Sequence, residues 1–81
     1  MTEAEFQKLS FHYKGIILFT EGKYLLSRSS DSYRIDIHSL YNFYVDVYYS
    51  KANNKIKKIE LISLDTKKRF YSDIGLLRKD G

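Results

Sequence analysis

Histidine is the side chain whose ordinary pKa lies nearest neutral pH, and this chain has two, His12 and His38. His38 follows Asp36 by two residues, so both side chains would lie on one face of a strand and could form an acid–base pair. We favour a simpler interpretation, in which His38 is a surface histidine near the end of a strand. His12 falls in a helical segment, where we expect it to be on the surface or half-buried.

Other kinds of catalytic chemistry lack their usual residues. The chain has no cysteine, so it offers no thiolate as a nucleophile or metal ligand. It contains no Gly-x-Ser-x-Gly sequence, and its four glycines are isolated, which excludes a glycine-rich phosphate loop. Two distant histidines and scattered carboxylates do not form a convergent set of metal ligands. We therefore expect a protein that is not an enzyme, with no catalytic residues, no metal and no cofactor.

A binding surface is better supported, by the stretch YNFYVDVYYS at residues 41–50. Aromatic residues there fall on both faces of a strand, and one face must meet the core. The other face carries Tyr44, Asp46 and Tyr48, which could be exposed, covered by the C-terminal tail or covered by a partner. Aromatic residues and arginine are enriched in protein interfaces. We predict a partner-binding surface formed by Tyr44, Tyr48, Arg34 and His38.

Basic residues are concentrated in one part of the chain. Residues 51–69 carry seven lysines and arginines against two acids. The simpler interpretation is a solvated hairpin whose lysines prevent edge-to-edge pairing. The alternative is a nucleic-acid site in which sheet-face tyrosines stack on bases. Asp36 and Asp46, expected within that platform, would repel phosphate. The cations of this alternative site are Lys57, Lys58, Lys67, Lys68 and Arg69.

Length and composition limit the kind of protein. A chain of 81 residues forms one small domain, 1–81, with a thin stability margin. Its start, MTEAEFQKL, does not resemble a signal peptide, and its longest apolar run, IILF, is too short to span a membrane. We therefore expect a cytoplasmic location and no membrane partner.

Helical periodicity occupies residues 3–21. Thr2 and Glu5 have the spacing of a capping box, Ser10 could cap a second helix, and Gly22 stands where the helical part should end. The region is either one helix broken near residue 10 or two short helices. Phe11, Leu18 and Phe19 lie off the main apolar stripe, so we expect this part to be covered on more than one side. The stripe consists of Phe6, Leu9, Tyr13, Ile16, Ile17 and Thr20.

Alternating patterns then predict strands at 23–30, 33–38, 43–49 and 56–63. Charge pairing favours a register in which Ile37 meets Phe43, which places Arg34 opposite Asp46. In the next hairpin we expect a longer loop or bulge, with Asn53 or Asn54 in the left-handed region and Val45 paired with Ile59. The tail, 65–81, fits either a short strand near 69–71 or a helical turn.

These elements define an α+β fold, with N-terminal helical segments packed on one face of an antiparallel β-meander of four to five strands. The function that we expect is a small non-enzymatic domain that binds another protein or associates with itself. The alternative is a nucleic-acid-binding module that uses the basic hairpin and the sheet-face tyrosines.

Overall fold

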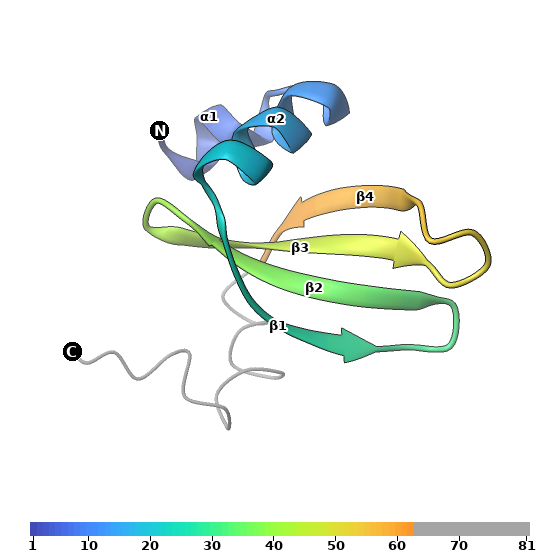
Figure 1. Cartoon of the computed structure of the whole chain (residues 1–81). Coiled ribbons are helices and arrows are strands. Elements are labelled where there is room, and N and C mark those ends of the chain that lie inside the picture. The colour runs from blue at the N-terminus through green and yellow to red at the C-terminus, as the bar shows by residue number, and fades with distance from the viewer. Residues whose placement is uncertain (63–81) are drawn as a thin grey trace.

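Two helices precede a four-stranded sheet (Figure 1). The computed structural model describes residues 1–62. The strands follow one another in the order β1-β2-β3-β4, and each pair of neighbours is antiparallel. This arrangement confirms the predicted α+β fold, with helices on one face of an antiparallel meander. The elements are α1 (Glu3–Gln7), α2 (Phe11–Glu21), β1 (Lys23–Ser29), β2 (Tyr33–Leu40), β3 (Phe43–Ser50) and β4 (Ile56–Leu61).

Local side chains set the ends of both helices. The Thr2 backbone N–H donates to Glu5 Oε1 over 2.8 Å, and the Glu5 N–H donates to Thr2 Oγ1 over 3.1 Å, which completes the predicted capping box. Ser10 Oγ accepts a hydrogen bond from the Tyr13 N–H over 3.2 Å and begins α2. The helical region is therefore two short helices.

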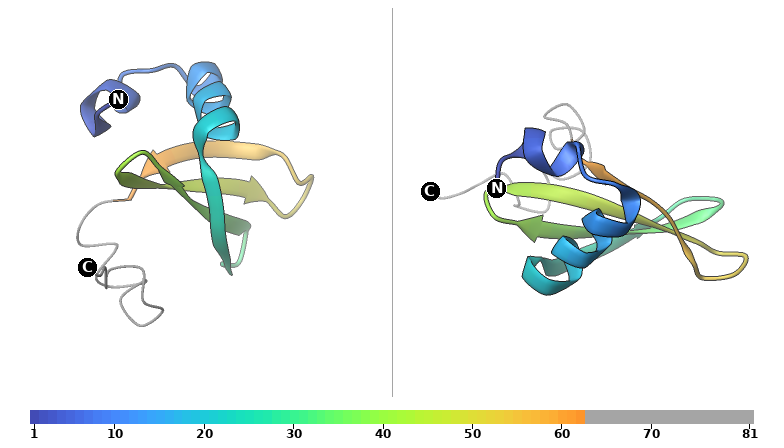
Figure 2. Two further views of the ribbon diagram at one scale, coloured as in Figure 1. Left: turned by 60° about the vertical axis from the view of Figure 1, so that its left-hand side comes forward. Right: turned by 90° about the horizontal axis from the view of Figure 1, so that it is seen from above.

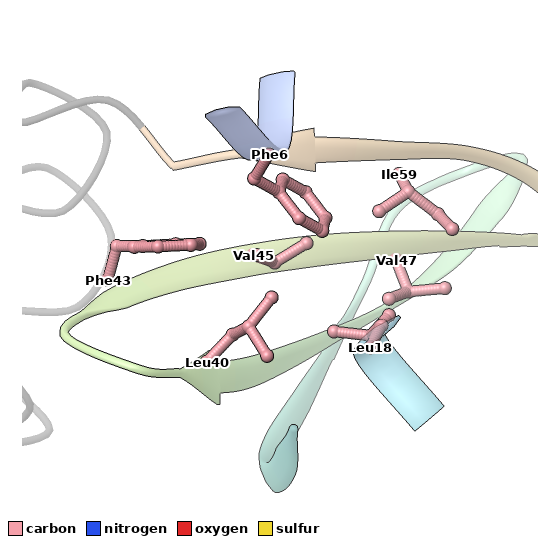
Figure 3. Packing of buried hydrophobic residues seen from close by; sticks show 7 residues of the cluster. All are labelled: Phe6, Leu18, Leu40, Phe43, Val45, Val47 and Ile59. Carbon is pink, nitrogen blue, oxygen red and sulfur yellow. The ribbon is translucent and has the colours of Figure 1, made fainter. Parts of the chain in front are cut away.

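The main core lies between the helices and the sheet. Both helices lie on the same side of the sheet (Figure 2). Phe6 from α1 and Leu18 from α2 point onto the sheet from that side (Figure 3). The Phe6 and Phe43 rings are 5.8 Å apart between centroids. Both helices are thus held by few side chains, since each contributes one fully buried residue. The buried members of this cluster are Phe6, Leu18, Leu40, Phe43, Val45, Val47 and Ile59.

The predicted register between β2 and β3 is wrong by three residues. Leu40, and not Ile37, lies opposite Phe43, so Ile37 lies opposite Asp46. The strands are joined by a tight turn in which Tyr41 has a φ of 56°. A positive φ at the first central position is typical of short hairpin turns, but it is uncommon for a bulky residue. The residue type at position 41 therefore did not indicate that the turn is so short and begins after Leu40.

Because the register error is odd-numbered, it exchanges the two faces of β2. Arg34, Asp36 and His38 lie on the face toward the helices, in register with Tyr49, Val47 and Val45. The isoleucines of β2, which we expected in the helix-facing core, lie on the opposite face. There Ile37 is buried in a second cluster with Ile62, and Leu25, Leu26 and Tyr44 pack against it.

The β3–β4 hairpin follows the prediction in its loop but not in its register. Asn54 has a φ of 60°, and the pairing shifts at a bulge between Tyr48 and Tyr49, as expected. Ile59 pairs with Val47 instead of Val45, so Lys58 lies opposite Tyr48 and not Asp46. Lys58 therefore faces away from the helices.

The predicted tail elements and the C-terminal segment that could cover Tyr44 and Tyr48 lie outside the described residues. Within 1–62, neither helix has the length or the apolar character that a bilayer span requires.

Candidate functional site

The structure separates the four residues predicted to form one partner-binding surface. Tyr44 and Tyr48 lie on the sheet face away from the helices, as expected. Arg34 and His38 lie on the helix face, because of the register described above. These four side chains therefore cannot form a single patch.

The face that carries the tyrosines is packed and charge-paired. Tyr48 is half-buried, with the Tyr33 ring edge-on to it at 5.6 Å and the Lys58 ammonium 4.5 Å from its centroid. Asp46 is only 3% exposed, and its carboxylate lies 3.4 Å from the Arg28 guanidinium. This face offers less free aromatic surface than the sequence suggested.

The alternative nucleic-acid site is only partly described. Lys58 contacts both Tyr48 and, at 3.5 Å, the carboxylate of Glu60. Lys57 lines a hollow together with Phe11 and Lys14 of α2. Asp36, expected to repel phosphate from the tyrosine platform, lies on the opposite face. Lys67, Lys68 and Arg69 lie outside the described residues.

A cluster of rings around His38 lies where the end of α2 meets β1 and β2. The His38 ring is held edge-to-face between Phe19, at 5.9 Å, and Tyr24, at 5.8 Å. His38 is 6% exposed, and its Nδ1 atom has no hydrogen-bond partner in the described part of the chain. Burial lowers the pKa of His38 below its ordinary value of 6.5, and Asp36 opposes this shift in part. A neutral imidazole in an aromatic setting fits a packing role.

Polar groups continue from this cluster along β1 and β2. The Tyr24 hydroxyl is 2.9 Å from Ser27 Oγ, which donates to Asp36 Oδ1 over 2.5 Å. Arg34 Nε also donates to Asp36 Oδ1, over 3.2 Å. The guanidinium lies 4.3 Å from the Tyr49 ring centroid. Burial raises the pKa of Tyr49, Asp36 raises it further, and Arg34 opposes the increase. Ser27 and Arg34 thus satisfy the hydrogen-bonding capacity of Asp36 Oδ1 in its buried position.

The polar groups of this network are not arranged as a serine–histidine relay. Ser27 donates to Asp36, and no hydrogen bond joins it to His38, so the relay of a serine nucleophile is not formed. Among residues 1–62, no group of three His, Asp or Glu side chains converges in a way that could hold a metal ion.

Most of the exposed large apolar side chains of the described chain lie on α2 and the start of β1, and the two others are Met1 and Tyr41. Those on α2 and β1 form the exposed α2 surface, and their exposed fractions lie between 43% and 58%. Two of them, Tyr13 and Ile16, belong to the stripe that the sequence placed in the core, and that placement is wrong. Leu18 replaces them as the buried residue of α2. The exposed α2 surface consists of Phe11, Tyr13, Ile16, Phe19 and Tyr24.

A groove of about 490 Å³ runs between α2 and β4. We call it the α2–β4 groove. A more polar hollow adjoins it, where Lys14 and Lys57 stand beside Phe11. The two depressions share Phe11 and Ile59, so they lie next to each other. The α2–β4 groove is lined by Phe11, His12, Gly15, Ile16, Lys55, Ile56 and Ile59.

Sequence reasoning did not choose the exposed α2 surface, although a signal was present. Apolar residues occur all round α2, and we inferred from them that this part is covered on more than one side. The described residues cover one side only. Phe11 and Phe19, which lay off the stripe, are both about half exposed.

Comparisons of the chain with known protein families, curated proteins and solved structures find no significant match. The described residues form a small α+β domain with an exposed apolar helix.

Proposed function

We propose that this chain is a non-enzymatic protein-interaction domain and that its contact surface is the exposed α2 surface. The observation that carries the proposal is the exposure of five large apolar side chains, each by more than two fifths, around one short helix. Large exposed apolar patches are characteristic of interaction sites, and these side chains all lie within one short part of the chain.

The energetics of the helix support this assignment. An isolated helix as short as α2 is marginal in water, so tertiary contacts must hold it. Leu18 is its only fully buried residue, and Ile17 is half-buried. A partner that covers Phe11, Ile16 and Phe19 would add burial worth about 25 cal/mol per Å² of apolar area. Binding would then stabilise the helix as well as join two proteins.

The side chains of this surface also suit an interface. Phenylalanine and tyrosine bury large areas with few rotatable bonds, and they are enriched at the centres of interfaces. Phe19 and Tyr24 each pack edge-to-face against the buried His38 ring, which limits their rotamers before binding. Such preorganisation lowers the entropic cost of association.

A second copy of the chain is the first partner to test. Light scattering after size exclusion, over a range of protein concentrations, measures self-association directly. A partner of another kind is tested by capture from cells that express the protein, with quantitative mass spectrometry. Both measurements compare the unmodified chain with a variant that carries Phe11→Ser, Phe19→Ser and Tyr24→Ser.

The proposal expects a dimer, or a set of captured proteins, that the variant loses while its thermal melt remains cooperative. A matched control carries Thr20→Ser and Lys23→Ser, which change exposed residues outside the surface. A monomer at all concentrations, together with the same captured proteins for all three chains, would refute the proposal. Captured nucleic acid that survives the variant would instead favour the basic residues of β4.

A further inference from the structure

No contact within the described chain explains why a glycine occupies the middle of α2. Glycine inside a helix costs about 1 kcal/mol relative to alanine. A Cβ atom built on Gly15 would have no neighbouring heavy atom within 4 Å, so no internal contact requires its absence. Gly15 lines the α2–β4 groove. The missing side chain leaves the helix backbone open to approach from outside.

The groove around Gly15 is apolar at its base and cationic at its margin. Phe11, Ile16 and Ile56 supply the apolar lining, and Lys55 stands beside them. Lys14 belongs to the adjoining hollow.

A further lysine of that hollow, Lys57, is exposed on the same side. Lys58 is different, since it is matched with Glu60 at 3.5 Å. The α2–β4 groove and the adjoining hollow are therefore positively charged. This charge comes from Lys14, Lys55 and Lys57.

The charge and the shape of the α2–β4 groove indicate which kind of ligand it binds. We propose that the α2–β4 groove binds a segment of another protein that is apolar on one side and acidic on the other, with its backbone close to Gly15. Apolar side chains of the segment enter between α2 and β4, and its carboxylates face the three lysines. This inference rests on the proposed function and names the chemistry of the partner.

A second copy of this chain is a poorer occupant. Its net charge of +4 would bring like charge to a positive rim. A helix laid in a groove is a common way to recognise such segments, because residues three and four apart share one face.

The probe is a fluorescein-labelled synthetic peptide in which leucines recur at helical spacing and every other position is glutamate or alanine. A second peptide replaces each glutamate with lysine. Fluorescence anisotropy measures the affinity of both for the full chain. We expect the acidic peptide to bind, with an affinity that falls as salt is raised, and the basic peptide not to bind.

Two variants test the groove itself. Gly15→Leu fills the groove and favours the helix, and Lys14→Glu with Lys57→Glu reverses its rim. Each should weaken binding of the acidic peptide by about tenfold or more, equivalent to about 1.4 kcal/mol. Their controls are Thr20→Leu, which adds an apolar side chain to α2 outside the groove, and Lys23→Glu, which reverses a charge on β1. Both controls should bind as the unmodified chain does.

Thermal melts confirm that each variant is folded before its affinity is interpreted. Absence of binding by the acidic peptide, equal binding of both peptides, or unchanged binding by the Gly15→Leu variant would each overturn the inference. The proposed function and the groove assignment can be refuted independently of each other. If capture of a partner depends on Phe19 and Tyr24 but not on Gly15 and the lysines, the interaction domain stands and the groove assignment is wrong.

Discussion

Replacing Leu18 with alanine tests how α2 is oriented on the sheet. Leu18 is fully buried among Val47, Leu40 and their neighbours (Figure 3). The change removes three carbon atoms, which at about 0.8 kcal/mol each is a loss of about 2 to 3 kcal/mol. The cavity that remains raises the expected loss to about 3 to 4 kcal/mol. A domain of this size has a total stability of roughly 5 kcal/mol, so the variant should be close to unfolding.

The matched control is Ile16→Ala, two residues away on the same helix. Ile16 is 43% exposed, and alanine is the better helix former, so we expect a loss below about 1 kcal/mol. Urea denaturation followed by circular dichroism measures both variants. With a slope of about 1 kcal/mol per molar urea, Leu18→Ala should lower the midpoint by about 3 M. Equal losses for the two variants would refute the orientation of α2 and, with it, the exposed α2 surface.

Three further outcomes follow from the geometry. Gly15→Ala should stabilise the domain by up to about 1 kcal/mol, because alanine is the better helix former. Gly22→Ala should destabilise the domain, because the new Cβ would lie 2.5 Å from the Leu18 carbonyl oxygen. Thermal melts of the two variants compare these effects directly. His38 is protonated near pH 6.5 in the unfolded chain but only at lower pH in the folded chain. The domain should therefore lose stability as the pH falls below 6.5. The variant His38→Phe should flatten that part of the stability–pH curve. Asn54→Gly should preserve or raise the melting temperature by relieving the positive φ, and Asn54→Val should lower it; a drop with glycine would contradict the assigned loop conformation.

Sequence reasoning predicted the elements well, because their signals are local. Thr2 with Glu5, and Ser10, each satisfy backbone groups within one turn of the helix that they begin. Period-two alternation located β2 and β3 to within two residues. A left-handed residue at Asn53 or Asn54 followed from the conformational freedom of asparagine, and the structure shows that it is Asn54.

Register was harder to predict because it depends on the exact length of a turn. Tyr41 adopts a conformation that tyrosine rarely takes, so nothing in its type marked a tight turn after Leu40. The apolar pattern was also misleading, since β2 buries residues on both faces. Asp36 and His38 are buried toward the helices, where Ser27 and Arg34 donate to the carboxylate.

The candidate site was missed for a related reason. The apolar residues of α2 were assigned to a core that has room for only part of them. An 11-residue helix that crosses a small sheet buries one narrow stripe, and periodicity alone does not fix which stripe it is. Leu18 was placed off the stripe, yet it is the residue that packs on Val47 and Leu40.

Photo-crosslinking in cells tests the central claim most directly. A benzoylphenylalanine residue is placed at Phe19, in the exposed α2 surface, or at Tyr48, on the opposite sheet face, and adducts are analysed by mass spectrometry after irradiation. We expect a discrete protein adduct from position 19, lost when Phe11 and Ile16 are replaced with serine, and none from position 48. A protein adduct from position 48 alone would contradict this expectation and return the contact surface to the face that carries Tyr44 and Tyr48.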